Sequence, residues 1–531
     1  MTTARPPDAA TRSGHGPTAR SGPAAFLRSA FTLDLRSLAL FRLLLGSILI
    51  ADALCRVPDA PLTLAPDGML PPDLVRPFVG HPWSWSIGLW CDAPWWGYGL
   101  LVAEGLCGLL LAAGLGLPLT TTAAWVVVVS LVRRTAPVTN AGDVFLATLL
   151  FWGQFLPLKP RSPQGNRLCG GIAAFALTLQ VAAVYLSAGL AKCNGVWWSG
   201  EAVGYALSVH DHGTPLGNSI ADWGWGGRLL TWATLVVELL GPPLLLLPQL
   251  RLPLVGTFVL FHLAIAVTMD VCLFPWVGIA ASAALLPGSF WDQIGVSGTS
   301  TTTGEPAGDG LDRPRRILCG GAILVALIAF AHANGPWRQE RMPAGPRHAV
   351  QLTFLEQDWR VFGDIRPQRQ WVYGRAELAN GEIVDLLRQG RPVETVLPNG
   401  GFHGLGNQRR QKLFWELPKP EYRVFAAAIA TALARQWNSN HPPERQVISL
   451  EIHGARVITA PKPGAIQDVL MATWPPRSPT GQGNLDRFLR DSAPFPDDAD
   501  RGLAAPGGQG RCPGASAAPL DAAAGTSSTA C

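Results

Sequence analysis

The chain has 531 residues, of which 48% are hydrophobic and only 15% are charged. Soluble domains carry about 25% charged residues, so this composition favours a membrane protein. The net charge of +5 is small and spread along the chain, with no basic stripe of the kind that binds nucleic acid. The nine cysteines stand mostly within or beside apolar segments, which excludes a disulfide framework, and no CxxC spacing indicates zinc.

The N-terminal part of the chain changes from polar to apolar within the first forty residues. Residues 1–25 are polar and rich in Pro, Gly and Ser, and they are predicted to form a disordered tail. The first apolar helix comes later and is too long for the apolar core of a cleavable signal peptide. We therefore predict that it is a signal anchor.

Nine apolar segments are candidate membrane helices, and we expect eight or nine of them to span the bilayer. Several are shorter than the roughly 20 residues that a span needs, and these are tilted, extended or re-entrant. The segments are 35–55, 95–116, 119–133, 141–158, 168–190, 229–247, 252–269, 271–286 and 317–333. Lys and Arg are more frequent in the loops on the N-terminal side, which predicts a multi-pass cell-membrane protein with a cytoplasmic N-terminus and an extracytoplasmic C-terminal domain.

The C-terminal part of the chain reads as soluble. Residues 291–313 are rich in Gly, Ser and Thr and are predicted to be a flexible linker before a last membrane helix at 314–334. The composition then changes, and residues 342–470 are predicted to form a small soluble α+β domain. The remainder, 471–531, is rich in Pro, Gly, Ala and Ser and is predicted to be disordered. The expected fold class is thus mainly α, a polytopic helical bundle with this added domain.

Four elements are predicted inside the soluble domain. Residues 350–355 alternate like a strand, and 447–453 read as another strand. Residues 371–378 and 382–387 flank the Asn380-Gly381 turn, which is typical of a hairpin. Residues 423–437 are Ala-rich and are predicted to be a helix.

Lys192 is the most informative single residue. It ends a long apolar helix and is followed at once by a glycine and by Trp197 and Trp198. A charged group near lipid depth is costly, and burial favours a neutral amine that can act as a base. The alternative is that the side chain only extends to the lipid headgroups, and both interpretations stay open on position alone.

Other polar residues stand within the apolar segments. Arg42 must find a partner inside the bundle, and Glu104 and Glu238 are the candidates for a structural ion pair that fixes helix packing. His262 can be a proton relay, a hydrogen-bond donor to a quinone or a satisfied core residue. His210 and His212 have no evident third ligand, so we expect an ordinary loop and no metal site.

Three spaced elements resemble the HTTM family, which includes the vitamin K-dependent gamma-glutamyl carboxylase. They are Ser37-Leu-Ala-Leu-Phe-Arg42 with Gly46 and Asp52, then Tyr185 to Lys192 and Trp197, then Phe261-His262 followed by Leu273-Phe-Pro-Trp-Val277. The resemblance covers roughly residues 34–286, so an HTTM-like transmembrane domain is expected at 26–290. The short soluble part resembles that of bacterial family members, in Asp358-Trp359 with Phe362 and in Gly381 to Asp385.

The resemblance implies an activity of the carboxylase (lyase) type. In that enzyme an amine base deprotonates reduced vitamin K, oxygenation yields a strong base, and a glutamyl γ-carbanion then adds carbon dioxide. The resemblance implies that Lys192 is this base and that His262, Trp197 and Trp198 shape the substrate pocket. The expected cofactor is reduced vitamin K or another membrane quinol, without a metal, and the expected partners are membrane lipid and a glutamyl peptide.

One departure from the carboxylase pattern bears on that activity. The carboxylase has paired Asn followed by His where this chain reads Asn140-Ala-Gly-Asp143, so the His is missing and carbanion formation is put in question. A non-enzymatic membrane scaffold that displays an extracytoplasmic domain is therefore an alternative. A transporter ranks last, because no internal repeat is evident.

Overall fold

The computed structural model describes residues 30–159, 167–209, 212–296, 310–397, 401–459 and 464–476. The predicted tails at 1–25 and, apart from its first residues, at 471–531 lie outside the described residues. The same holds for most of the predicted linker and for His210.

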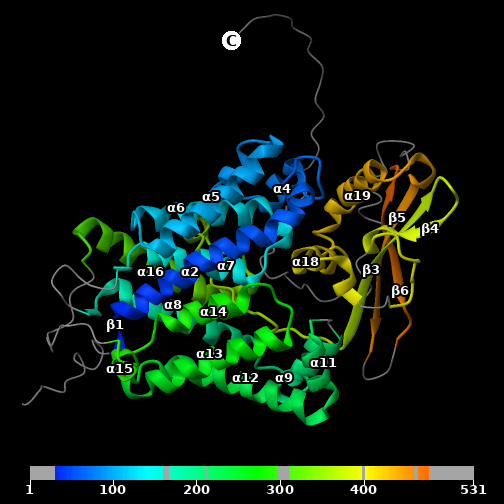
Figure 1. The fold of residues 1–531 in the computed structure, drawn as a ribbon. Coiled ribbons are helices and arrows are strands. Elements are labelled where there is room, and N and C mark those ends of the chain that lie inside the picture. Colours follow the sequence, from blue (N-terminus) through cyan, green and yellow to red (C-terminus); the bar gives the residue numbers. More distant parts are fainter. Residues whose placement is uncertain are drawn as a thin grey trace, which may run out of the picture.

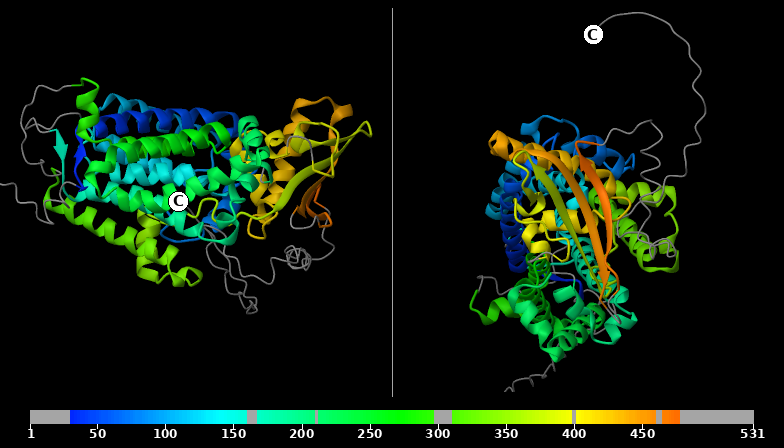
Figure 2. Two further views of the ribbon diagram at one scale, coloured as in Figure 1. Left: turned by 90° about the horizontal axis from the view of Figure 1, so that it is seen from below. Right: turned by 90° about the vertical axis from the view of Figure 1, so that its right-hand side faces the viewer.

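Helices coincide with all nine apolar segments, and they run side by side as an elongated bundle (Figures 1 and 2). They are α2 (Leu35–Arg56), α5 (Pro94–Ala113), α6 (Leu119–Arg134), α7 (Ala141–Gly153), α8 (Ile172–Ala191), α12 (Gly224–Leu244), α13 (Arg251–Thr268), α14 (Phe274–Ala283) and α16 (Arg313–Asn334). The mainly helical fold class is thereby confirmed.

Five helical segments of the described chain are long and apolar enough to cross a membrane. They are Leu35–Thr63, Pro94–Ala113, Ile172–Ala191, Pro248–Thr268 and Arg313–Asn334. Helices α7 and α14 are apolar but shorter, so the larger number of eight or nine spans is not confirmed.

Helices α2 and α5 approach closely because glycines face each other. A Cβ on Gly46 would lie 2.6 Å from the Gly108 carbonyl oxygen, and a Cβ on Gly108 would lie 2.7 Å from the Gly46 carbonyl oxygen. Small residues at such a crossing let two backbones touch, which is the usual way in which membrane helices associate.

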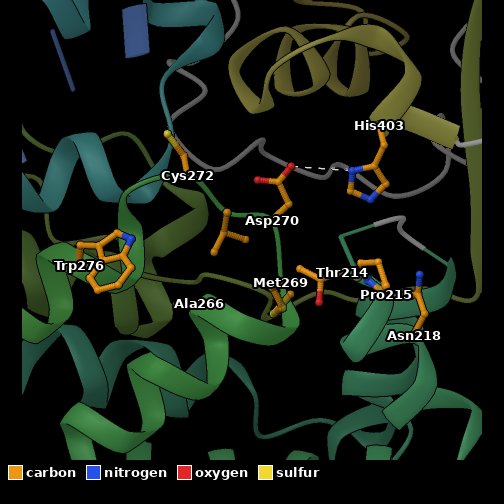
Figure 3. A pocket seen from close by; sticks show the side chains of 11 residues that line it. Thr214, Pro215, Asn218, Ala266, Met269, Asp270, Cys272, Trp276 and His403 are labelled. Carbon is orange, nitrogen blue, oxygen red and sulfur yellow. Dashed lines mark ion pairs between the residues drawn. The ribbon is translucent and has the colours of Figure 1, made fainter. Parts of the chain in front are cut away.

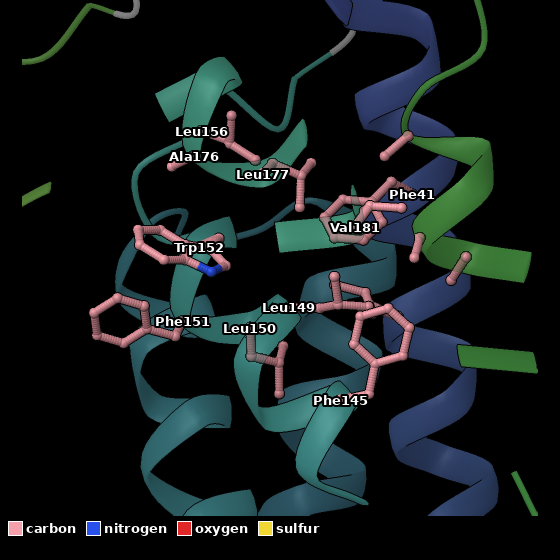
Figure 4. Close-up of a cluster of buried hydrophobic side chains, with 14 of the residues drawn as sticks. Phe41, Phe145, Leu149, Leu150, Phe151, Trp152, Leu156, Ala176, Leu177 and Val181 are labelled. Carbon is pink, nitrogen blue, oxygen red and sulfur yellow. The ribbon is translucent and has the colours of Figure 1, made fainter. Parts of the chain in front are cut away.

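A large apolar cluster joins helices α2, α7 and α8 in the middle of the bundle (Figure 4). Phe41 comes from α2, Phe145 and Trp152 come from α7, and Leu177 and Val181 come from α8. All five side chains are almost completely buried. The packing of these helices against one another therefore fixes where the polar residues at their ends come to lie.

Short elements connect the bundle helices. Strands β1 (Leu33–Asp34) and β2 (Leu168–Cys169) pair at one end. The short helices are α3 (Ala60–Thr63), α4 (Pro72–Val79), α9 (Gly195–Trp198), α10 (Ala202–Gly204), α11 (Pro215–Asp222), α15 (Gly288–Gln293) and α17 (Ala344–Thr353).

The C-terminal domain, described here as residues 364–476, lies at the other end of the bundle (Figures 1 and 2). Its antiparallel sheet has the order β4-β3-β5-β6, with helices α18 and α19 packed beside it. The elements are β3 (Gln368–Leu378), β4 (Ile383–Asp385), α18 (Gln408–Glu416), α19 (Ala426–Asn440), β5 (Val447–Ile458) and β6 (Gln467–Trp474).

Most of the predicted elements of this domain are confirmed. Strands β3 and β4 form the expected hairpin, whose turn residue Gly381 has a φ of +84° that favours glycine. The predicted helix and the second strand correspond to α19 and β5. The predicted strand at 350–355 is wrong, because these residues end helix α17, which stops at Phe354 in the left-handed conformation.

The domain shares its apolar core with the membrane bundle. Phe414, Ile429 and Leu450 pack in one cluster with Leu62 and Leu70, which belong to the segment after α2. The C-terminal domain is therefore docked on the bundle rather than tethered to it as a separate unit.

Candidate functional site

Lys192 is buried at the end of α8 and is surrounded by acceptors. Its Nζ lies 2.9 Å from Oε2 of Glu238 and 2.8 Å from the Val361 carbonyl oxygen. A longer contact of 3.4 Å reaches the Ala188 carbonyl oxygen, and the Trp197 ring centroid is 5.1 Å away. Because only 3% of the residue is exposed, the side chain does not extend outwards in this structure.

The residues that follow Lys192 hold the segment 361–363 against the bundle. Asn194 caps helix α9 through the Trp197 amide, and its Nδ2 donates to the Gly363 carbonyl oxygen over 2.8 Å. The indole of Trp197 donates to the Phe362 carbonyl oxygen over 3.0 Å. Trp198, by contrast, is 54% exposed. The residues that follow Lys192 thus connect the end of helix α8 to the segment 361–363.

His262 lies deeper in the bundle, among aromatic rings. Its Nε2 is 2.9 Å from the hydroxyl of Tyr185, and the Tyr185 ring stacks on Phe258 with a centroid distance of 4.1 Å. Within the described part of the chain, Nδ1 of His262 has no hydrogen-bond partner. A Cβ on Gly278 would lie 2.2 Å from the imidazole, so glycine is needed there to make room for His262.

The structure gives Arg42, Glu104 and Glu238 other neighbours than the predicted ones. Glu238 pairs with Lys192, and neither Glu104 nor Glu238 forms an ion pair with Arg42 among the described residues. Arg42 faces Gly114 at the C-terminal end of α5, whereas Glu104 is fully buried in the middle of that helix, ten residues earlier. Since ten helical residues span about 15 Å, Arg42 and Glu104 cannot meet.

A second buried charge cluster joins the bundle to the C-terminal domain. Arg409 donates to both carboxylate oxygens of Asp143 over 2.7 Å and to Asp52 over 2.6 Å. Arg56 donates to Asp52 over 2.9 Å and to Asp143 over 3.2 Å. Burial alone would lower the pKa of Arg409, but the carboxylates of Asp143 and Asp52 outweigh it and raise that pKa well above its usual value.

A pocket of about 500 Å³ opens beside this cluster, between the loop after α13 and the C-terminal domain (Figure 3). Asp270 and His403 face each other across it, with 3.7 Å between Oδ2 and Nδ1. The remaining lining residues are Gly213, Thr214, Pro215, Asn218, Ala266, Met269, Val271, Cys272 and Trp276. Every lining residue but His403 comes from the membrane bundle and its loops.

The sequence interpretation missed His403 and Arg409. Both stand in a polar stretch of the C-terminal domain without a recognisable motif. His212, which was expected to be an ordinary loop residue, packs against Phe362 and Trp415.

Comparison with known proteins gives one family match, which covers part of the chain. Residues 162–289 match the family model of the HTTM domain, and this range includes Lys192, Trp197, Glu238 and His262. No curated protein and no solved structure matches the chain. The chain therefore contains a region, residues 162–289, that matches the HTTM domain.

Proposed function

We propose that the protein is a carboxylase-like enzyme of the cell membrane that uses a membrane quinol, with Lys192 as the base. The observation that carries this proposal is the buried pair of Lys192 and Glu238 within the HTTM domain. An amine that is buried at a site with a carboxylate partner is a candidate for acid–base chemistry.

The pair gives Lys192 access to its neutral form. In a medium of low dielectric the charged pair loses the hydration of both ions, so it lies closer in free energy to the neutral pair than it would in water. Across the 2.9 Å contact Lys192 can pass its proton to Glu238 and become a free amine. This is the form that can accept a proton from a substrate.

The pocket beside Asp270 fits a quinol by size and by the chemistry of its lining. Small-molecule sites have volumes of about 300–1,000 Å³ and combine apolar walls with a few polar groups. Met269 and Trp276 would contact the ring, while Asp270 and His403 would bind its hydroxyl groups. When bound, a quinol supplies two electrons and an oxygen that becomes nucleophilic after deprotonation.

Lys192 does not line this pocket. Met269, which lines the pocket, packs in the same apolar cluster as Phe362 and Trp197. The proposal therefore requires the segment 361–363 to release Lys192 during the reaction. His262 and Trp197 would keep the surroundings of the amine apolar, and Trp198 would contact substrate only from the surface.

Carboxylation of a glutamyl peptide is the second part of the proposal. Asp143 stands where the carboxylase pattern has its polar Asn-His element, and both of its carboxylate oxygens are engaged by Arg409. The base that deprotonates the peptide must therefore be formed from the bound quinol, and Asp143 does not supply it.

The test uses the purified protein in detergent with a reduced naphthoquinone and oxygen. Quinone epoxide is measured with and without a glutamyl peptide and labelled bicarbonate. We expect epoxide from the wild type and from Lys159→Ala, an exposed lysine that serves as the matched control, and none from Lys192→Ala. Label in the peptide establishes carboxylation, and equal epoxide from Lys192→Ala overturns the role of Lys192.

A second candidate function is a non-enzymatic membrane scaffold that displays the C-terminal domain. It is favoured by the contacts of Lys192, whose acceptors hold the segment 361–363 in place, and by the buried ion pairs of Arg409. This candidate predicts no epoxide from any variant. For either function, a membrane-impermeant maleimide should label Ser439→Cys, an exposed position on α19, in intact cells if the domain is extracytoplasmic.

A further inference from the structure

The pocket beside Asp270 is built by two parts of the chain that are far apart in sequence. Asp270 follows α13, and its amide donates to the His212 carbonyl oxygen over 2.8 Å, while Gly213 and Met269 form a β-bridge. These contacts fix the carboxylate on the bundle side. His403 enters from the C-terminal domain, on the short 3-10 helix Gly401–Leu405.

The position of His403 is fixed from both sides along the chain. Phe402 and Leu405 are buried in the core of the C-terminal domain, and the Phe402 ring packs against Trp415 with a centroid distance of 5.1 Å. Arg409 is anchored on Asp143, six residues further on. His403 itself is 39% exposed, and its ring points into the pocket toward Thr214 and Pro215 at the start of α11 (Figure 3).

We propose that His403 and Asp270 form an acid–base pair, and that His403 accepts the proton of a hydroxyl group on an aromatic ligand in this pocket. The aromatic character of the ligand rests on the proposed function above. A quinol has two hydroxyl groups, so the pair acts on one of them whichever group receives the other proton.

The geometry assigns a role to each ring nitrogen. Nδ1 faces the Asp270 carboxylate, which favours the tautomer with its proton on Nδ1 and leaves Nε2 free to accept. One proton moves from the ligand oxygen to Nε2, so the ligand becomes an anion and the imidazole becomes a cation beside the carboxylate. The separation of 3.7 Å exceeds a hydrogen bond, and such contacts commonly shorten when a ligand binds.

The test uses the full-length protein in detergent and 4-nitrophenol, whose phenolate is yellow. At a pH where the free probe is mainly protonated, equilibrium dialysis measures binding and absorbance measures the bound phenolate. We expect a yellow bound probe with the wild type and with His441→Gln, a histidine elsewhere in the same domain. We expect the probe to stay bound to His403→Gln and to lose its yellow colour, with a partial loss in Asp270→Asn.

Quinol oxidation provides a separate readout. The rate should fall roughly 10²-fold in His403→Gln, and free imidazole should partly restore it in His403→Ala. Phenolate formation without quinol oxidation would overturn the proposed function and leave the acid–base pair standing. Equal colour in His403→Gln, or no binding of the probe to the wild type, would overturn the pair.

Discussion

Arg409 holds Asp143 by two hydrogen bonds of 2.7 Å each, although 266 residues separate the two in the chain. The contact joins the first turn of α7 to α18 of the C-terminal domain. It is buried on both sides, and Asp52 of α2 completes it. Together with the shared apolar core, this contact fixes the position of the C-terminal domain and of His403 on the bundle.

Replacing Arg409 by Ala should destabilise the protein strongly. The substitution leaves two buried carboxylates short of their partner, and breaking a buried pair in this way costs about 3–5 kcal/mol. Arg435→Ala is the matched control, because Arg435 pairs with Asp67 and both side chains are mostly exposed. We expect that control to cost about 1 kcal/mol or less. Unfolding in detergent measures both, and equal losses would contradict the role of Arg409.

The stability of the C-terminal domain should fall in acid through Glu416. Burial alone would raise the pKa of Glu416, but the ammonium groups of Lys412 and Lys419 outweigh it and lower that pKa below its usual 4.5. A carboxyl group whose pKa is lower in the folded state than in the unfolded state stabilises the fold above about pH 4.5. This stabilisation is lost as the pH falls through the pKa of the folded state. Tryptophan fluorescence on heating should show a smaller acid effect in Glu416→Gln than in the wild type. Glu444→Gln, at an exposed position, should behave like the wild type.

The close packing around His262 should not tolerate a methyl group on Gly278. The new Cβ would lie 2.2 Å from Cε1 and Nε2 of the imidazole, so His262 must shift and its contact with Tyr185 must lengthen. Overpacking of this kind costs about 1–3 kcal/mol. Gly256→Ala on α13 has open space around it and should be neutral or stabilise by about 0.5–1 kcal/mol. A melting temperature of Gly278→Ala at or above that of Gly256→Ala would show that His262 is free to move.

The bundle helices and the β3–β4 hairpin could be predicted because their signals are local. Apolar runs predict helices, and Asn380-Gly381 predicts a turn, without knowledge of what lies beside them. The prediction of a strand at 350–355 was wrong because a short alternating run is also compatible with the end of a helix. Strand β6 was not predicted at all, although it pairs along β5.

The candidate site depends on contacts that the sequence does not show. Lys192 could be recognised from its apolar setting, but its partner could not. The antiparallel alignment of α2 and α5 places Arg42 beside Gly114, ten residues along the chain from Glu104, which removes the pairing that charge alone suggested. Arg409 and His403 could not be recognised, since their partners lie in distant segments and neither residue stands in a motif.

A double variant can separate the structural and the chemical role of Lys192. Lys192→Met leaves Glu238 as an unpaired buried carboxylate, which should cost about 3–5 kcal/mol. Lys192→Met with Glu238→Leu removes both charges, and well-packed apolar replacements of a buried pair are often neutral or stabilising. Asn194 and Trp197 still hold the segment 361–363 in this variant. We therefore expect the free energy of unfolding of this double variant to lie within about 1 kcal/mol of the wild-type value.

The activity of that stable double variant then decides the role of the amine. Without Lys192 it should form no quinone epoxide, because no amine remains to take the first proton. Epoxide at the wild-type rate would show that Lys192 only holds the segment 361–363, and the base would then have to lie in the pocket with His403. If the double variant is as unstable as Lys192→Met, the hydrogen bond to Val361 rather than the charge pair carries the stability. In that case Lys192→Arg, which keeps a donor and the charge, should restore stability without restoring an amine base.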